Sequence, residues 1–270
     1  MAAYAINPGP RHRPRKRFGQ HFLHDPAVIA RIVNAIAPRA DQDIVEIGPG
    51  TGNLTRGLLQ AAGKLQVIEI DRDLATALPR RCTGLGELRV HQTDVLDLKL
   101  NTLVTSDKKL RLVGNLPYNI STPLIFHLLD QADRVLDMVF MLQKEVAVRL
   151  AAAPGGRDYG RLSVMVQYRC TVERLFDVGP GAFSPPPKVD STVVRLVPRT
   201  PVLAAQDPAS LARVIRLAFA QRRKTLANAL KTLLAPADLT GLRISPQARA
   251  ETLGVDDFVR LANALSRGGF

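Results

Sequence analysis

The chain has 270 residues, enough for one full α/β domain and a smaller appended unit. Its composition, 46% hydrophobic and 23% charged, is ordinary for a globular protein, and no apolar run approaches the ~20 residues of a membrane span. The formal net charge of +13 indicates a polyanionic partner, because Lys and Arg gain affinity by displacing counterions from phosphates.

Residues 1–17 combine Pro, Gly and basic side chains without apolar periodicity, which predicts a flexible basic arm. We expect Arg15, Lys16 and Arg17 in this arm to bind nucleic acid. The arm lacks the apolar stretch of a secretory signal, so a cytoplasmic protein is expected. The two cysteines stand far apart without metal-ligand spacing, so neither a metal site nor a disulfide is expected.

A folded domain is expected from residue 18 to residue 200. It begins with a helix, because Asp25-Pro26 is a typical helix start and apolar residues then repeat at helical spacing until Pro38. Short apolar runs separated by helix-length segments then predict parallel strands. The predicted strands are Ile44–Ile47, Leu65–Ile70, Leu88–Val90, Leu110–Val113 and Met138–Leu142.

Two later runs, Leu162–Val172 and Ser191–Val197, have strand character with no helix between them. They predict an antiparallel pair at the sheet edge and bring the count to seven strands. A proline-rich segment from Pro198 to Pro208 then leads into purely helical patterns. We therefore expect an α/β fold with a small all-α C-terminal domain over residues 201–270.

A glycine-rich turn follows the first predicted strand of the sheet, in the run Glu46-Ile47-Gly48-Pro49-Gly50-Thr51-Gly52. Glu69 ends the next strand, 21 positions after Gly48, where an acidic residue binds the ribose of an adenosine cofactor. The loop reads G-x-G-x-G rather than the dinucleotide pattern G-x-G-x-x-G, and it has no phosphate-binding lysine. The pattern favours S-adenosylmethionine over a nicotinamide dinucleotide. Asp94, after the third strand, is a candidate acceptor for the adenine amine, with a solvated loop residue as the equal alternative.

The most specific motif is Asn115-Leu116-Pro117-Tyr118, which follows the fourth predicted strand. An exocyclic amine on a purine is a poor nucleophile, so its protons need well-placed acceptors. The side-chain oxygen of Asn115 and the carbonyl of Leu116 can supply them. Pro117 fixes the turn, and Tyr118 offers a face on which an extruded base can stack.

With these motifs the chain resembles, over nearly its full length, the small-subunit ribosomal RNA adenine dimethyltransferases. The matching segments are Arg15–Leu23, Glu46–Gly50, Asn115–Ser121, Phe183–Ser191 and Phe219–Leu226, the last read as a helix. The resemblance implies a Rossmann-like seven-stranded methyltransferase sheet. It also implies transfer of methyl groups from S-adenosylmethionine to N6 of two adjacent adenines in the 3′-terminal hairpin loop of small-subunit rRNA, coupled to subunit assembly.

The resemblance also assigns roles to individual residues. It implies cofactor contacts from His21, Leu23, Gly48, Glu69, Asp94 and Asn115, although many relatives have Asn where this chain has His21. Phe183 would stack opposite Tyr118, and Arg222, Arg223 and Lys224 would bind the rRNA backbone. The expected partner is the small ribosomal subunit, without a membrane, and the chain is expected to act as a monomer. Two alternatives stay open: the related large-subunit rRNA dimethyltransferase, and a ribosome assembly factor without significant catalysis.

Overall fold

The structure is a computed structural model that describes residue 15, residues 20–104 and residues 107–267. The chain divides into two compact units, and each is described by itself. The first unit comprises residues 1–147 and 173–198, and the second comprises residues 148–172 and 199–270. The predicted arm, with Lys16 and Arg17, lies outside the described residues except for Arg15.

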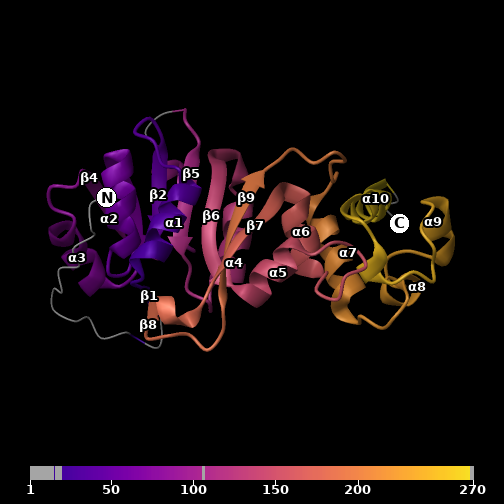
Figure 1. The fold of residues 1–270 in the computed structure, drawn as a ribbon. Helices are drawn as coiled ribbons and strands as arrows, with labels where there is room; N and C mark the ends of the chain where they lie inside the picture. Colours follow the sequence, from indigo (N-terminus) through magenta and orange to yellow (C-terminus); the bar gives the residue numbers. More distant parts are fainter. Residues whose placement is uncertain (1–14, 16–19, 105–106, 268–270) are drawn as a thin grey trace. The chain divides into compact units, whose positions relative to one another are not determined.

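A seven-stranded sheet, in the order β4-β3-β2-β5-β6-β9-β7, organises the first unit (Figure 1). Its strands are β2 (Asp43–Ile47), β3 (Lys64–Glu69), β4 (Glu87–Gln92), β5 (Leu110–Asn115), β6 (Val135–Gln143), β7 (Cys170–Val178) and β9 (Ser191–Pro198). Neighbours among β2 to β6 pair in parallel, and β9 pairs antiparallel with β6. The predicted Rossmann-like sheet of seven strands is therefore confirmed.

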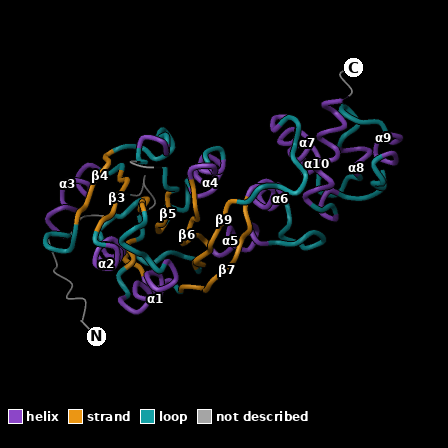
Figure 2. Tube along the Cα trace, turned by 90° about the horizontal axis from the view of Figure 1, so that it is seen from above, coloured by secondary structure: helices purple, strands orange, loops and turns teal. Residues whose placement is uncertain are grey.

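In this unit, α-helices lie before and between these strands. They are α1 (Pro26–Ile36), α2 (Asn53–Ala62), α3 (Arg72–Arg81), α4 (Ser121–Leu129) and α5 (Lys144–Ala151). Figure 2 shows α1 and α2 on one face of the sheet and α4 on the other. The predicted start of α1 is confirmed, because the Asp25 side chain accepts hydrogen bonds from the backbone N–H groups of Ala27 and Val28.

A second, two-stranded sheet joins segments that are far apart in the sequence. Strand β1 (Phe22–Leu23) pairs antiparallel with β8 (Phe183–Ser184), and the N–H of His24 donates to the carbonyl of Ala182 at 2.9 Å. The sequence analysis did not predict this sheet, because two-residue strands have no periodicity to detect. The pairing holds the segment before α1 beside the start of the Phe183–Ser191 motif.

The predicted strand over Leu162–Val172 is wrong in its first part. Residues Arg161–Arg169 form helix α6, and the strand begins only at Cys170. Alternating apolar residues imitate a strand here, but Gly160 caps a helix: its N–H donates to the Ser163 hydroxyl and its carbonyl accepts from the N–H of Val164. Local capping outweighs the alternation of apolar residues.

The second unit is helical except for the beginning of β7. Its C-terminal helices are α7 (Pro208–Ala220), α8 (Leu226–Ala229), α9 (Pro236–Gly241) and α10 (Val255–Arg267). The sequence predicts a helical domain that begins at residue 201. In the structure, residues 148–172 also belong to this unit. Tyr159 and Val164 from this segment are buried in the same hydrophobic core as Leu211, Val214 and Phe258. Across residues 20–104 and 107–267, no helix is long and apolar enough to cross a membrane.

Candidate functional site

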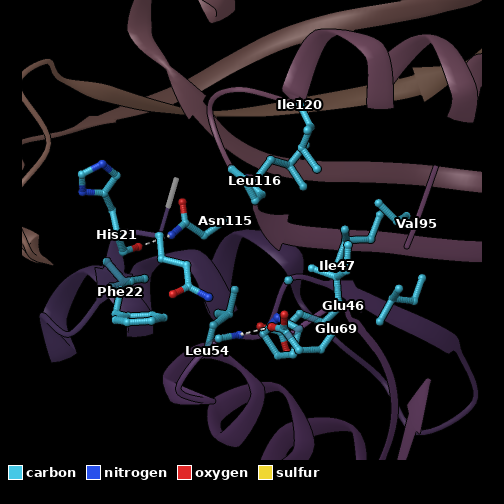
Figure 3. Close-up of a pocket in the computed structure, with 18 of the residues that line it drawn as sticks. His21, Phe22, Glu46, Ile47, Leu54, Glu69, Val95, Asn115, Leu116 and Ile120 are labelled. Atoms are coloured by element: carbon cyan, nitrogen blue, oxygen red, sulfur yellow. Dashed lines mark hydrogen bonds between the residues drawn. The ribbon is translucent and has the colours of Figure 1, made fainter. Parts of the chain in front are cut away.

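A cavity of about 310 Å³ opens where strands β2, β3 and β5 end. Strand β2 lies between β3 and β5, so the chain changes direction along the sheet at this point, which is where ligands bind in open α/β folds. Figure 3 shows side chains from the strand ends and from the segment before α1 around the cavity. The polar lining residues are Gln20, His21, Glu46, Thr51, Asn53, Glu69, Thr93, Asp94, Asn115, Tyr118 and Asn119.

The glycine turn forms one wall of the cavity. Gly48 donates its N–H to the carbonyl of Ile68 at 2.9 Å, which anchors the turn to β3. Gly50 has φ +57°, and a Cβ there would stand 3.0 Å from the Phe22 ring. A side chain at this position would be strained by both backbone conformation and space, so glycine lets the turn bend close to the cavity.

Glu69 lies at the end of β3 with its carboxylate fixed by backbone donors. One oxygen accepts from the N–H of Gly50 at 3.1 Å and the other from the N–H of Asp71 at 2.9 Å. Burial is the main reason that the pKa of Glu69 is raised, and these two hydrogen bonds act in the opposite direction. Glu69 therefore joins the glycine turn to the end of β3 in one wall of the cavity.

Glu46 is a second buried carboxyl group at the cavity and was not singled out as a site residue by the sequence analysis. Its side chain is 1% exposed, and no described residue offers a hydrogen bond to its Oε2 atom. Burial raises the pKa of Glu46 to about 8, the neighbouring Thr55 hydroxyl acts in the opposite direction, and the charge of Glu69 adds a smaller rise. An unpartnered buried oxygen at a cavity wall is a site where a ligand donor fits.

Asp94 also lines the cavity, on the turn that follows β4. Its Oδ1 atom accepts from the N–H of Leu96 at 2.9 Å, which fixes the carboxylate relative to the turn. The cavity thus has three acidic residues, and none of its described lining residues is Lys or Arg. In a chain of net charge +13, the lack of a basic group among these described lining residues disfavours a pyrophosphate as the ligand.

Asn115, the last residue of β5, lies on the other side of the cavity. Its side-chain amide nitrogen donates to the backbone carbonyl of His21 at 3.0 Å, as the dashed line in Figure 3 marks. Because a carbonyl can only accept, this contact fixes which way the amide group is turned. The N–H of Leu116 donates to the carbonyl of Met141 at 3.1 Å, which holds the next residue to β6.

Tyr118 is held at both its hydroxyl and its ring. The hydroxyl hydrogen-bonds the Ser191 hydroxyl at 2.7 Å, and the ring stacks on His21 with 5.6 Å between ring centroids. Burial raises the pKa of Tyr118. The His21 Nδ1 atom is in turn 2.8 Å from the carbonyl oxygen of Pro185. Sequence analysis missed Ser191, because a serine at a strand start has no distinguishing signal.

Leu23 and Phe183, two further predicted site residues, face each other in the β1–β8 sheet. Leu23 lines the cavity, and its carbonyl accepts from the side-chain nitrogen of Asn53 at 2.7 Å. Phe183 is 2% exposed and belongs to the hydrophobic core, not to the described cavity lining. The aromatic partner of Tyr118 in this structure is His21, and stacking by Phe183 stays a prediction.

The predicted RNA-binding residues differ in how they are held. Arg15 forms ion pairs with Asp71, at 3.2 Å, and with Asp73. The segment from Phe219 to Leu226 is not one helix, because α7 ends at Ala220 and a turn precedes α8. Arg222, Arg223 and Lys224 are all exposed on this turn, but Arg222 also makes contacts within its own unit.

Arg222 makes three contacts within the second unit. Its guanidinium donates to the carbonyls of Arg157 at 2.7 Å and Tyr159 at 3.0 Å, and lies 3.5 Å from the carboxylate of Glu251. These contacts indicate that Arg222 stabilises the second unit. In the part of the chain that the structure describes, no His, Cys, Asp and Glu residues cluster in a way that could hold a metal ion.

The chain matches a known family over almost its whole length. Residues 11–267 match the family described as Ribosomal RNA adenine dimethylase. The chain belongs to this family. The Ribosomal RNA small subunit methyltransferase A of Nitrosococcus oceani is 58% identical over 251 residues, which cover 93% of this chain and 95% of that protein.

Two solved structures extend this comparison. A dimethyladenosine transferase from Plasmodium falciparum has a TM-score of 0.79 at 29% identity, covering 93% of this chain and 99% of that one. The 23S rRNA methyltransferase ErmE has a TM-score of 0.68 at 27% identity, covering 91% and 99%. Both matches span the two units of this rRNA adenine dimethylase, not the sheet alone.

As an enzyme of this family, the chain uses S-adenosylmethionine as its methyl donor. The cavity fits that cofactor. Its volume of about 310 Å³ is in the range of small-molecule sites, and its acidic lining suits a ligand with a sulfonium and an ammonium group. The unpartnered oxygen of Glu46 supplies an acceptor that no described residue uses.

Proposed function

We propose that this chain transfers methyl groups from S-adenosylmethionine to N6 of two adjacent adenines in the 3′-terminal hairpin loop of small-subunit rRNA. The product is N6,N6-dimethyladenosine, and the reaction is coupled to small-subunit assembly. The observation that carries the proposal is the fixed orientation of Asn115. Because its amide nitrogen is engaged by His21, the Oδ1 atom is left as the acceptor for an incoming amine.

Asn115 and Leu116 act on the adenine amine. Their two oxygens accept hydrogen bonds from its protons and favour a tetrahedral nitrogen whose lone pair points at the methyl group. S-adenosylmethionine supplies that methyl as an electrophile. No strong general base is needed, because the amine proton becomes acidic once the nitrogen is alkylated. Pro117 keeps the turn in place, with its carbonyl accepting from the N–H of Ile120 at 3.2 Å.

The cofactor is proposed to bind along the glycine turn and the ends of β3 and β4. Glu69 would accept hydrogen bonds from ribose hydroxyls, and Asp94 from the adenine amine. Gly48 lets the backbone approach the ligand, and His21, Leu23 and Asn115 would also contact it, since all three line the cavity. Glu46 would accept from the ammonium group of the methionine part, a contact supported by its unpartnered oxygen.

Tyr118 is proposed to stack on the extruded adenine, and Phe183 to wall the other side of the base. Walls that stack rather than donate hydrogen bonds tolerate a monomethylated amine, which two successive transfers require. Because Phe183 is buried in the core, its role requires local movement when RNA binds, whereas His21 already lies against Tyr118.

The proposed partner is the assembling small subunit, to which the chain would bind as a monomer in the cytoplasm. Arg15, Lys16 and Arg17 would approach RNA phosphates from the arm, and Arg223 and Lys224 from the turn after α7. Arg222 is proposed to contribute less to RNA binding, because its guanidinium donates to the carbonyls of Arg157 and Tyr159.

The experiment that tests the proposal is transfer of labelled methyl groups to unmethylated small subunits, with large subunits, naked rRNA and duplex DNA in parallel. We expect label as dimethyladenosine in small subunits alone. Label in large-subunit RNA would favour the reaction named for the structural relative ErmE. No label in any substrate would favour an assembly factor without catalysis.

A further inference from the structure

The topology brings Ser191 to the acceptor side of the cavity from far along the chain. Strand β9 runs antiparallel to β6, so its first residue lies where the parallel strands end: Asn115 is opposite Met141, and Ser191 is opposite Gln143. The Ser191 side chain is therefore at the same edge as Tyr118, although 73 positions separate them.

The Ser191–Tyr118 hydrogen bond has ordinary geometry, and its serine end is buried. The two hydroxyl oxygens are 2.7 Å apart, and Ser191 is 0% exposed. The backbone of Ser191 is fixed by pairing with β6, and the preceding residue, Asp190, accepts from the N–H of Lys144 at 2.9 Å. A phenol tethered to a fixed point cannot change the direction of its ring axis without losing the bond.

The ring of Tyr118 is restrained from a second direction by His21. Their rings are stacked with an interplanar angle of 27°. The hydroxyl tether sets the ring axis, and this contact sets the plane of the ring. The backbone contributes as well, because the carbonyl of Tyr118 accepts from the Ser121 hydroxyl at 3.1 Å. The flat face of Tyr118 is thus held in one orientation relative to Asn115.

We propose that Ser191 is a positioning residue for methyl transfer, and that its buried hydroxyl holds Tyr118 so that a stacked adenine presents its amine to Asn115 and Leu116. This inference rests on the proposed function, since it takes Tyr118 as the stacking face. Ser191 acts only through Tyr118. Removing its hydroxyl should lower kcat but leave KM for the subunit almost unchanged, because phosphate contacts dominate RNA affinity.

The test is a double-mutant cycle on steady-state kinetics with unmethylated small subunits. Ser191→Ala and Tyr118→Phe remove the same hydrogen bond from opposite ends, so each should lower kcat by roughly threefold to tenfold. The double variant should be no slower than either single variant. Ser191→Thr, which keeps a hydroxyl, should restore most of the lost rate.

Thr192→Val is the matched control, because it removes a hydroxyl from the next residue of the same strand. That hydroxyl bonds Asp177 at 2.6 Å rather than Tyr118. The control should keep kcat within about twofold. A Ser191→Ala variant with the wild-type kcat, or a double variant whose losses multiply, would overturn the proposal.

A further variant separates this proposal from the function on which it rests. If Tyr118→Ala retains methyl transfer, the stacking role of Tyr118 fails, and the proposed chemistry of the site must be revised. If Tyr118→Ala is inactive but Ser191→Ala is as fast as the wild type, only the positioning role of Ser191 fails.

Discussion

The two sides of the cavity are built in different ways. The side around the glycine turn depends on contacts close in sequence, since Glu69 is bonded to residues 19 and 2 positions away. The side around Asn115 depends on distant segments, with Asn115 bonded 94 positions away and Tyr118 bonded 73 positions away. The first side is thus formed mostly by one stretch of the chain, with Phe22 and Leu23 as its distant contacts, whereas the second depends on segments up to 94 positions apart.

The largest loss of methyl-transfer rate is expected from changes at Asn115, which lies on the side of the cavity built from distant segments. Asn115→Ala should lower kcat by roughly 100-fold or more, because the acceptor for the amine is lost, while RNA binding stays intact. Asn115→Asp keeps an acceptor oxygen but loses the donor to the His21 carbonyl, so it should be equally slow. Single-turnover methyl transfer with an RNA-binding assay checks both variants. An active Asn115→Asp variant would mean that the distant contact with His21 is unimportant.

A change at Glu69 tests whether the glycine-turn side of the cavity binds the cofactor. Glu69→Gln keeps one acceptor oxygen but turns its amide NH2 toward the N–H of either Gly50 or Asp71, so one of the two hydrogen bonds is lost and affinity for S-adenosylmethionine should fall about 10-fold to 100-fold. Glu87→Gln makes the same chemical change at an exposed position of β4 and should leave binding unchanged. Isothermal calorimetry measures both. Equal affinities for the two variants would contradict the structural role of the Glu69 carboxylate.

A moderate effect on stability is expected from Glu46. Because its pKa is raised from 4.5 to about 8 in the folded state, the folded protein holds a proton that the unfolded chain releases. The free energy of unfolding should therefore fall as pH rises from about 4.5 to about 8. Glu46→Gln should lose this part of the slope, as urea unfolding at pH 5 and pH 8 without cofactor would show. Parallel slopes for the two proteins would rule this out.

The smallest effects concern the turn after α7, where neighbouring basic residues again differ in their distant contacts. Arg222→Ala should lower the free energy of unfolding by about 1 kcal/mol, because it removes hydrogen bonds to two carbonyls. Replacing Arg223 and Lys224 with Ala should leave stability unchanged and reduce the salt dependence of RNA binding by about 0.7 per charge. Thermal unfolding and salt-titrated RNA binding separate the two effects. An unchanged salt slope would mean that the turn does not contact RNA.

The same difference explains what could be predicted from sequence. The parallel strands and the start of α1 follow from apolar runs and a capping aspartate, so they were predicted within a few residues. The turn at Gly48 and the position of Glu69 were also found from local pattern. Helix α6 was misread, because Gly160 and Ser163 form a cap that the alternation of apolar residues conceals.

The pairing of β1 with β8 and the contact between Tyr118 and Ser191 were not predicted. Nothing in the residues around Phe22 or Ser184 indicates that they form a sheet, and nothing near Ser191 indicates a partner at Tyr118. Likewise, the basic run at Arg222 reads as uniform, although carbonyls 63 and 65 positions away engage only its first residue. Family resemblance supplied site residues on the Asn115 side and placed Phe183 opposite Tyr118, but it did not supply the contacts that hold Asn115 and Tyr118.

The β1–β8 sheet also sets an order of events during synthesis. Strand β1 can pair only after Phe183 and Ser184 have left the ribosome, long after the glycine turn and Glu69 have emerged. At roughly 5–20 residues per second, the chain between Asp94 and Ser184 takes several seconds to make. A nascent chain can therefore form its glycine turn early but cannot complete the Asn115 side of the cavity. The cavity is therefore completed late in the synthesis of the chain.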